Sequence, residues 1–151
     1  MILISACLVG INTRYDGTNC GEKRFRDLVA EGKAIPICPE QLGGLPTPRE
    51  PVELIGGDGD ALLNNDSRVI GKESGKDYTH NFLRGANEVL KIAHMLKIEK
   101  AILKDGSPSC GSTYIKRNGK KAKGIGVTAA ALIAAGIEVE SDEMKKPAIK
   151  R

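Results

Sequence analysis

The sequence predicts an α/β fold: a single three-layer, Rossmann-like domain whose mostly parallel sheet carries helices on both faces. Short apolar runs at 2–6, 34–37 and 101–103 are typical of buried strands. The segment 78–96 has apolar residues at steps of three and four, which is typical of a helix packed on a sheet. Strands that alternate with helices predict a parallel sheet covered on both faces. The length of 151 residues fits one domain of about 100–200 residues.

The remaining elements follow from turn signals and apolar patterning. Segment 39–51 contains four prolines, which fix much of its backbone and predict a stiff functional loop. Asn118-Gly119 is a common two-residue hairpin turn. In chain order we expect a strand at 2–6, a helix at 25–30, a strand at 34–37, a hairpin of strands 52–55 and 67–70, a helix at 78–96, a strand at 101–103, a hairpin over 114–123, a helix at 128–135 and an edge strand at 137–139.

Composition narrows the class of protein. With two Phe, three Tyr and no Trp, the core must be aliphatic. The formal net charge of +4, from 23 basic and 19 acidic residues, allows an anionic partner without requiring one. The sequence shows no signal peptide and no apolar run of the roughly 20 residues that a membrane span needs. We therefore expect a cytoplasmic protein with one domain over 1–143 and a basic, flexible tail over 144–151.

Three cysteines follow three of the predicted strands. Cys7, Cys38 and Cys110 each lie at or just beyond the carboxyl end of an apolar run. The carboxyl ends of parallel strands share one edge of the sheet, where ligands of α/β proteins gather. The sequence therefore predicts that these three thiols, which we call the sheet-edge cysteines, converge in space. Cys20 follows no strand and is left out of this set.

Converging thiols point to a metal centre. Thiolates are soft ligands that select zinc, copper(I) or iron–sulfur clusters. A structural zinc site normally has four ligands with paired short spacing, and the chain has no Cys-x-x-Cys pair. The two histidines, His80 and His94, fall on or beside the long helix and are expected to be surface or packing residues. Three ligands would leave one metal position open for substrate.

Acid–base groups surround the cysteines. Glu40 follows Cys38 by two residues, and Ser107 and Ser109 precede Cys110. A carboxylate beside a metal can act as a general base. A solvated loop carboxylate is the simpler interpretation of Glu40, and only its closeness to the cysteines argues for catalysis.

These residues fall within five motifs that resemble the thiouracil desulfurase family, a small bacterial and archaeal family long catalogued as a domain of unknown function. The resemblance spans about Leu3 to Glu140. The motifs are 5–10 (SACLVG), 14–17 (RYDG), 38–49 (CPE followed by GGLPTPR), 107–111 (SPSCG) and 124–130 (GIGVTAA).

The resemblance implies a 4Fe-4S cluster held by the three sheet-edge cysteines, with the fourth iron open to a thione sulfur. It implies non-redox removal of sulfur from a thiolated pyrimidine, thiouracil to uracil, with Glu40 as general base and Ser107 positioning the substrate or the proton. Substrate contacts are expected from Asp16, Arg49 and Ser109. Such a cluster can be lost during aerobic purification.

Two alternatives remain open at this point. The basic stretch 116–123 could hold tRNA phosphates, which would make the protein a tRNA thionucleoside desulfidase or an RNA-binding sulfur-processing protein, although base-stacking aromatics are few. A zinc-bound structural or sulfur-carrier protein is the other alternative. The sequence leaves the oligomeric state undetermined.

Overall fold

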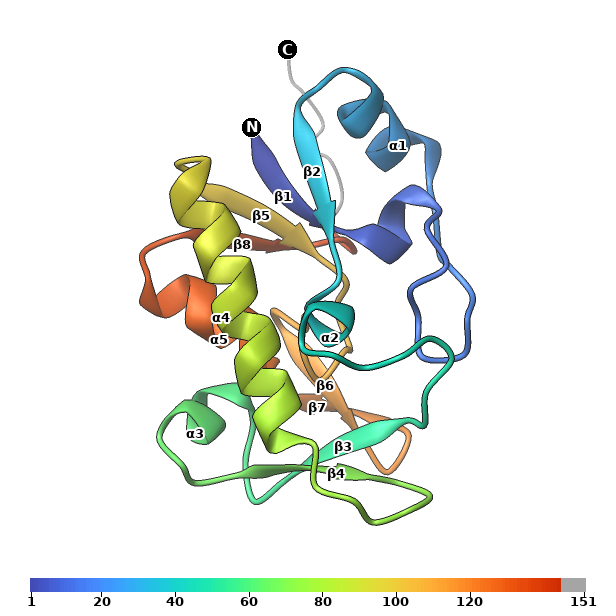
Figure 1. Ribbon diagram of the computed structural model, residues 1–151, viewed down its shortest axis with the longest axis vertical. Helices are drawn as coiled ribbons and strands as arrows, with labels where there is room; N and C mark the ends of the chain where they lie inside the picture. Colours follow the sequence, from blue (N-terminus) through green and yellow to red (C-terminus); the bar gives the residue numbers. More distant parts are fainter. Residues whose placement is uncertain (145–151) are drawn as a thin grey trace.

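A four-stranded parallel sheet forms the centre of the computed structural model, which describes residues 1–144 (Figure 1). Its strand order is β2-β1-β5-β8. The edge strand β2 contains Pro36 opposite Ile4 of β1, and an edge is where a sheet tolerates proline. The strands are β1 (Ile2–Ser5), β2 (Ala34–Ile37), β5 (Lys100–Leu103) and β8 (Glu138–Ser141).

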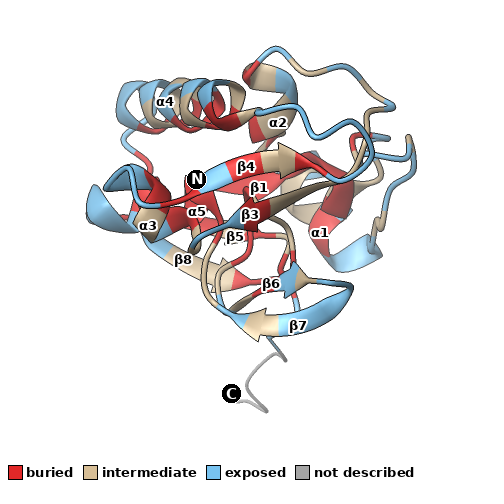
Figure 2. Cartoon of the chain, turned by 90° about the horizontal axis from the view of Figure 1, so that it is seen from below, coloured by how far each residue is buried: buried red, intermediate tan, exposed pale blue. Residues whose placement is uncertain are grey.

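Helices cover both faces of this sheet, which confirms the predicted three layers. On one face, helices α4 (Thr79–Met95) and α5 (Val127–Ala134) pack on the strands. On the other face, Phe25 of α1 (Lys23–Ala30) packs on Ile4 and Ala34. The large side chains that are fully buried are mainly aliphatic, as the composition predicts, and Figure 2 shows this buried interior.

Two antiparallel hairpins lie beyond the end of the sheet toward which the parallel strands point (Figure 1). One pairs β3 (Val52–Ile55) with β4 (Arg68–Gly71), and the other pairs β6 (Tyr114–Arg117) with β7 (Lys120–Lys123). Asn118 and Gly119 have φ of +53° and +76°, the positive values that a type I′ turn requires. Both hairpins were predicted from the sequence.

Three short helical segments were not predicted. They are η1 (Ala6–Val9), α2 (Pro39–Leu42) and α3 (Gly59–Leu63). The expectation of an irregular loop over 39–51 is therefore wrong for its first four residues, because Pro39 occupies a first-turn position where a helix needs no amide hydrogen. The Asp58 side chain caps α3 by accepting from Ala61 N at 3.1 Å. The first strand also ends one residue early, since Ala6 belongs to η1.

The predicted tail begins at Met144, and residues 145–151 lie outside the part of the chain that the structure describes. No helix within residues 1–144 is both long enough and apolar enough to cross a membrane.

Candidate active site

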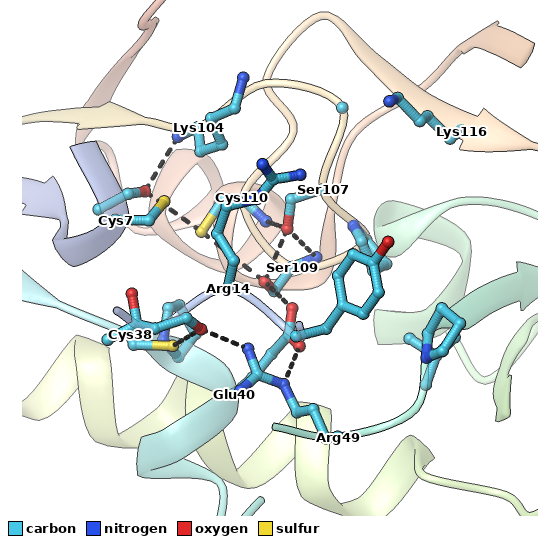
Figure 3. Close-up of a pocket in the computed structure, with 18 of the residues that line it drawn as sticks. Cys7, Arg14, Cys38, Glu40, Arg49, Lys104, Ser107, Ser109, Cys110 and Lys116 are labelled. Carbon is cyan, nitrogen blue, oxygen red and sulfur yellow. Dashed lines mark hydrogen bonds and ion pairs between the residues drawn. The ribbon is translucent and has the colours of Figure 1, made fainter. Parts of the chain in front are cut away.

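The sheet-edge cysteines meet at one cavity, as predicted from the sequence. Cys7 lies in η1 directly after β1, and Cys38 follows β2 as the N-terminal cap of α2. Cys110 lies in the loop after β5. All three line a cavity of about 490 Å³ (Figure 3). The parallel direction of the three strands is what brings residues from distant parts of the chain to the same edge.

Two of the three cysteines are buried, and Cys38 is half-buried. Cys7 and Cys110 are only 9% and 5% exposed. Burial raises the pKa of Cys110 to about 12. Burial also raises the pKa of Cys38, and it raises that of Cys7 further together with the neighbouring thiols of Cys20 and Cys110. Without metal these thiols are neutral, so metal binding must release protons from them.

Ser5, which was not predicted as a site residue, contacts one of these sulfurs. Ser5, the last residue of β1, donates a hydrogen bond from Oγ to Cys110 Sγ at 3.4 Å. The same Oγ accepts the amide of Lys104 at 2.9 Å. This bridge ties the ends of β1 and β5 together. A hydrogen bond to a ligand sulfur is also a means by which proteins tune iron–sulfur centres.

The arrangement fits a cluster better than a single metal ion. Within residues 1–144, no group of three His, Cys, Asp or Glu side chains is placed to hold one metal ion. A zinc ion would need such a group, with sulfur ligands about 2.3 Å from the metal. His80 and His94 lie on α4, as expected, and do not line the cavity. Three thiols that line one cavity fit three-cysteine ligation of a multi-iron group.

Cys20 also lines the cavity, a position that was not predicted from the sequence. Its amide donates to the carbonyl oxygen of Cys7 at 3.0 Å. The long loop after η1 therefore returns to the sheet edge, although no strand precedes Cys20. This return depends on a backbone contact between residues 13 positions apart, which no local sequence signal reveals.

Glu40 faces the cavity from α2 and is held on both carboxylate oxygens. Its Oε1 pairs with Nε of Arg49 at 2.8 Å, and its Oε2 accepts from Ser109 Oγ at 2.8 Å. The Glu40 and Arg49 side chains are only 12% and 8% exposed. Arg49 also donates to Thr13 O and Thr47 Oγ1, each at 2.8 Å. Arg49 was predicted to contact the substrate, yet the structure directs its donors mainly at protein groups.

Ser109 lies between Glu40 and Ser107, and Ser107 accepts the amide of Cys110 (Figure 3). Their hydroxyl oxygens are 3.0 Å apart. The loop that carries them is fixed by the buried carboxylate of Asp105, which accepts the amides of Ser112, Thr113 and Tyr114 at 3.0–3.2 Å. Both serines line the cavity, as predicted.

Asp16 does not line the cavity. Its carboxylate accepts from Thr18 N and Thr18 Oγ1 at 3.1 and 2.6 Å, which stabilises a surface turn. The structure thus does not bring Asp16 to the site, but places its neighbours Arg14 and Tyr15 there instead. An exposed aspartate in a Gly-rich loop carries no sequence signal that separates a turn-forming role from a binding role.

Cations gather along the cavity lining. Arg14, Lys72 and Lys116 all line it, and none has an ion-pair partner within residues 1–144. The lining carboxylates of Glu50 and Glu53 accept hydrogen bonds instead, Glu50 from Ser74 and Tyr78 and Glu53 from the amide of Asn118. The three cations therefore have no carboxylate partner among residues 1–144 and are available to an anionic ligand.

Comparison with known proteins gives the family of this chain. The family model described as 2-thiouracil desulfurase matches residues 2–144. The uncharacterized protein YbbK of Bacillus subtilis (strain 168) is 46% identical over 145 residues, covering 94% of this chain and 95% of YbbK. The solved structure of the [4Fe-4S]-dependent thiouracil desulfidase TudS is similar, with a TM-score of 0.81 and 42% identity over 94% of this chain and 90% of TudS. The chain therefore belongs to the 2-thiouracil desulfurase family.

Proposed function

We propose that the protein is an iron–sulfur-dependent, non-redox desulfurase that converts 2-thiouracil and water to uracil and hydrogen sulfide. The observation that carries the proposal is the meeting of three cysteines and the Glu40 carboxylate at one cavity. Family membership and the similarity to TudS support the same reaction. In this hydrolysis a C=S bond is replaced by C=O, so no electron donor is consumed.

Cys7, Cys38 and Cys110 are the residues that would hold a 4Fe-4S cluster. When bound, the cluster supplies a Lewis-acidic iron without a protein ligand, able to bind and polarise a thione. Ser5, through its hydrogen bond to Cys110 Sγ, stabilises the thiolate form that this ligand must adopt. Cys20 is not needed for three-cysteine ligation.

In this proposal Glu40 takes a proton from the attacking water. Its carboxylate is nearly buried and fixed by Arg49 and Ser109, so its orientation toward the cavity is set before substrate arrives. Such preorganisation lowers the cost of the proton transfer because nothing must reorient. Ser107, whose oxygen accepts two backbone amides, lines the cavity and lies 3.0 Å from Ser109 Oγ.

The test is turnover by protein reconstituted anaerobically and quantified for iron. We expect the wild type to release uracil and sulfide from 2-thiouracil in equal amounts, and the Cys110→Ala variant to release neither. Cys20→Ala is the matched control, since it removes a thiol from the same cavity. A fully iron-loaded wild type that leaves 2-thiouracil unchanged would exclude this reaction.

A second candidate substrate is a thiolated base within tRNA. The unpaired cations Arg14, Lys72 and Lys116 at the cavity favour it, because phosphates would supply the missing negative charge. If tRNA binds there, replacing Lys72 and Lys116 by Met should flatten the salt dependence of tRNA affinity by about 0.7–0.9 in slope per lost phosphate contact. Turnover of free 2-thiouracil should change little. An unchanged slope would exclude phosphate contacts at this rim.

A further inference from the structure

We propose that Tyr15 is a substrate-binding residue whose ring stacks on the planar face of the pyrimidine. This contact would make the site selective for ring thiones, in which the C=S carbon belongs to a planar ring. The inference rests on the proposed function, because it names how the site holds the substrate of that reaction. It assigns substrate binding to a residue that was not predicted from the sequence, in place of its neighbour Asp16.

Aromatic side chains are scarce in this chain, and two of them line the cavity. Of the two Phe and three Tyr residues, Phe25 and Phe82 belong to the core and are 4% and 2% exposed. Tyr78 does not line this cavity, whereas Tyr15 and Tyr114 do. These two tyrosines carry the aromatic rings on which a planar ligand in the cavity could stack.

The ring of Tyr114 is already in contact with protein groups. Its hydroxyl donates to Glu143 Oε2, and the Lys121 ammonium lies over the ring, 4.6 Å from its centroid. Gly106 lies against the ring edge, since a Cβ built there would be 2.9 Å from Tyr114 Cε2. Tyr15, by contrast, is 42% exposed, and among residues 1–144 its hydroxyl has no hydrogen-bond partner, unlike that of Tyr114. Tyr15 is thus the lining tyrosine whose ring is available to a ligand.

The backbone fixes Tyr15 beside the segment that orients Glu40. The Tyr15 carbonyl oxygen accepts the amide of Arg49 at 2.7 Å, and the guanidinium of Arg49 pairs with Glu40. On the other side, Asp16 accepts from Thr18 N and Thr18 Oγ1 and so stabilises the turn that follows Tyr15. The loop is therefore shaped before a ligand arrives, which lowers the entropy cost of binding.

A thiolated pyrimidine has the shape that such a ring recognises. Stacking on an aromatic side chain depends on the π-face of a base and is tolerant of the identity of that base. A ligand held by its face keeps its edge, which carries the sulfur and the ring N–H groups, free for other groups of the cavity. The cavity volume of about 490 Å³ fits a small ligand. Acyclic thioamides lack an aromatic face, so we expect ring thiones to be the preferred class of substrate.

The affinity for uracil tests the stacking contact, measured by equilibrium dialysis of the radiolabelled base against iron-loaded protein. Uracil has the ring of the substrate without its sulfur, so the measurement reports ring binding apart from the reaction. Tyr15→Leu keeps an apolar side chain but removes the aromatic face, and we expect it to bind uracil roughly 5- to 140-fold more weakly. Tyr15→Phe should bind like the wild type, because the hydroxyl has no partner to lose. Ile11→Ala is the matched control and should also bind like the wild type, since Ile11 is an exposed apolar residue of the same loop outside the cavity lining.

Steady-state turnover of 2-thiouracil gives a second readout. Tyr15→Leu should raise KM by a similar factor and leave kcat unchanged, because stacking holds the ring equally in the ground state and the transition state. A lowered kcat with an unchanged KM would overturn the inference, since Tyr15 would then act in the chemical step and not in ring binding.

The binding measurements can refute the contact in four ways. Tyr15→Leu could bind uracil as tightly as the wild type, Tyr15→Phe could bind as weakly as Tyr15→Leu, Ile11→Ala could weaken binding to the same extent, or the wild type could bind no uracil. Failure of the proposed function gives a different result. In that case the iron-loaded wild type would bind uracil in a Tyr15-dependent manner and still leave 2-thiouracil unchanged.

Discussion

A single methyl group added to α4 should displace the helix that carries Glu40. Gly85 of α4 faces Pro39 of α2, and a Cβ built on Gly85 would lie 2.0 Å from Pro39 O, whereas ordinary contact begins at 3.4 Å. The difference, 3.4 minus 2.0, requires α2 and α4 to separate by about 1.4 Å. Glu40 directly follows Pro39, so Gly85→Ala should move the carboxylate away from Ser109.

The magnitude can be worked from two opposing effects. Overpacking a close contact costs up to about 3 kcal/mol, while alanine improves on glycine inside a helix by about 1 kcal/mol. The net loss of about 2 kcal/mol should lower the Tm by roughly 4–8 °C in a domain of this size. A displacement of about 1 Å can lower kcat by roughly 10²-fold. We therefore expect a kcat about 10²-fold lower in a variant whose Tm falls by only a few degrees.

Thermal unfolding and 2-thiouracil turnover measure the two effects separately. Asn87→Ala is the matched control, since it changes an exposed position of the same helix. It gains helix propensity without touching α2. If Gly85→Ala were as stable and as active as Asn87→Ala, the close crossing of α2 and α4 would not position Glu40.

Two further predictions concern the thiols and the acid stability of the fold. Replacing any of the sheet-edge cysteines by Ala should abolish iron binding, while Cys20→Ala should retain it. The iron content per chain measures both outcomes. The ligand set would be refuted if Cys20→Ala lost its iron while an Ala variant of one of the other three kept it. Hydrogen bonds from Ser74 and Tyr78 lower the pKa of Glu50 from 4.5 to about 2. Because the folded pKa lies below the unfolded one, Glu50 stabilises the fold above pH 4.5, and this contribution is lost as the pH falls toward 2. The Tm difference between wild type and Glu50→Gln should therefore be constant above pH 4.5 and shrink below it; a difference independent of pH would refute this.

The sequence predicts the layers and the meeting of the cysteines because both follow from local patterns and strand direction. Apolar runs place the strands, and the parallel order then puts Cys7, Cys38 and Cys110 at one edge. The short helix α2 was missed because four residues carry too little periodicity to indicate a helix, and its proline indicated a loop instead.

Side-chain pairing could not be predicted in this way. Arg49 and Glu40 are charged residues in a Pro-rich segment, and nothing in their spacing shows that they pair with each other. Ser109 lies 69 residues from Glu40 in sequence, so its role as a bridge depends on the packing of α2 against the loop after β5. Asp16 shows the reverse case, since its motif suggested binding while its contacts are those of a turn.

The central claim is that Glu40 acts as the base beside a cluster held by three cysteines. Turnover of 2-thiouracil by Glu40→Gln protein, reconstituted anaerobically and matched to wild type in iron content, tests it most directly. Glutamine keeps the shape of the side chain and cannot accept a proton at neutral pH. We expect a full cluster and a loss of at least the roughly 10²-fold typical of a removed general base. Wild-type turnover by Glu40→Gln protein with a full cluster would contradict the claim.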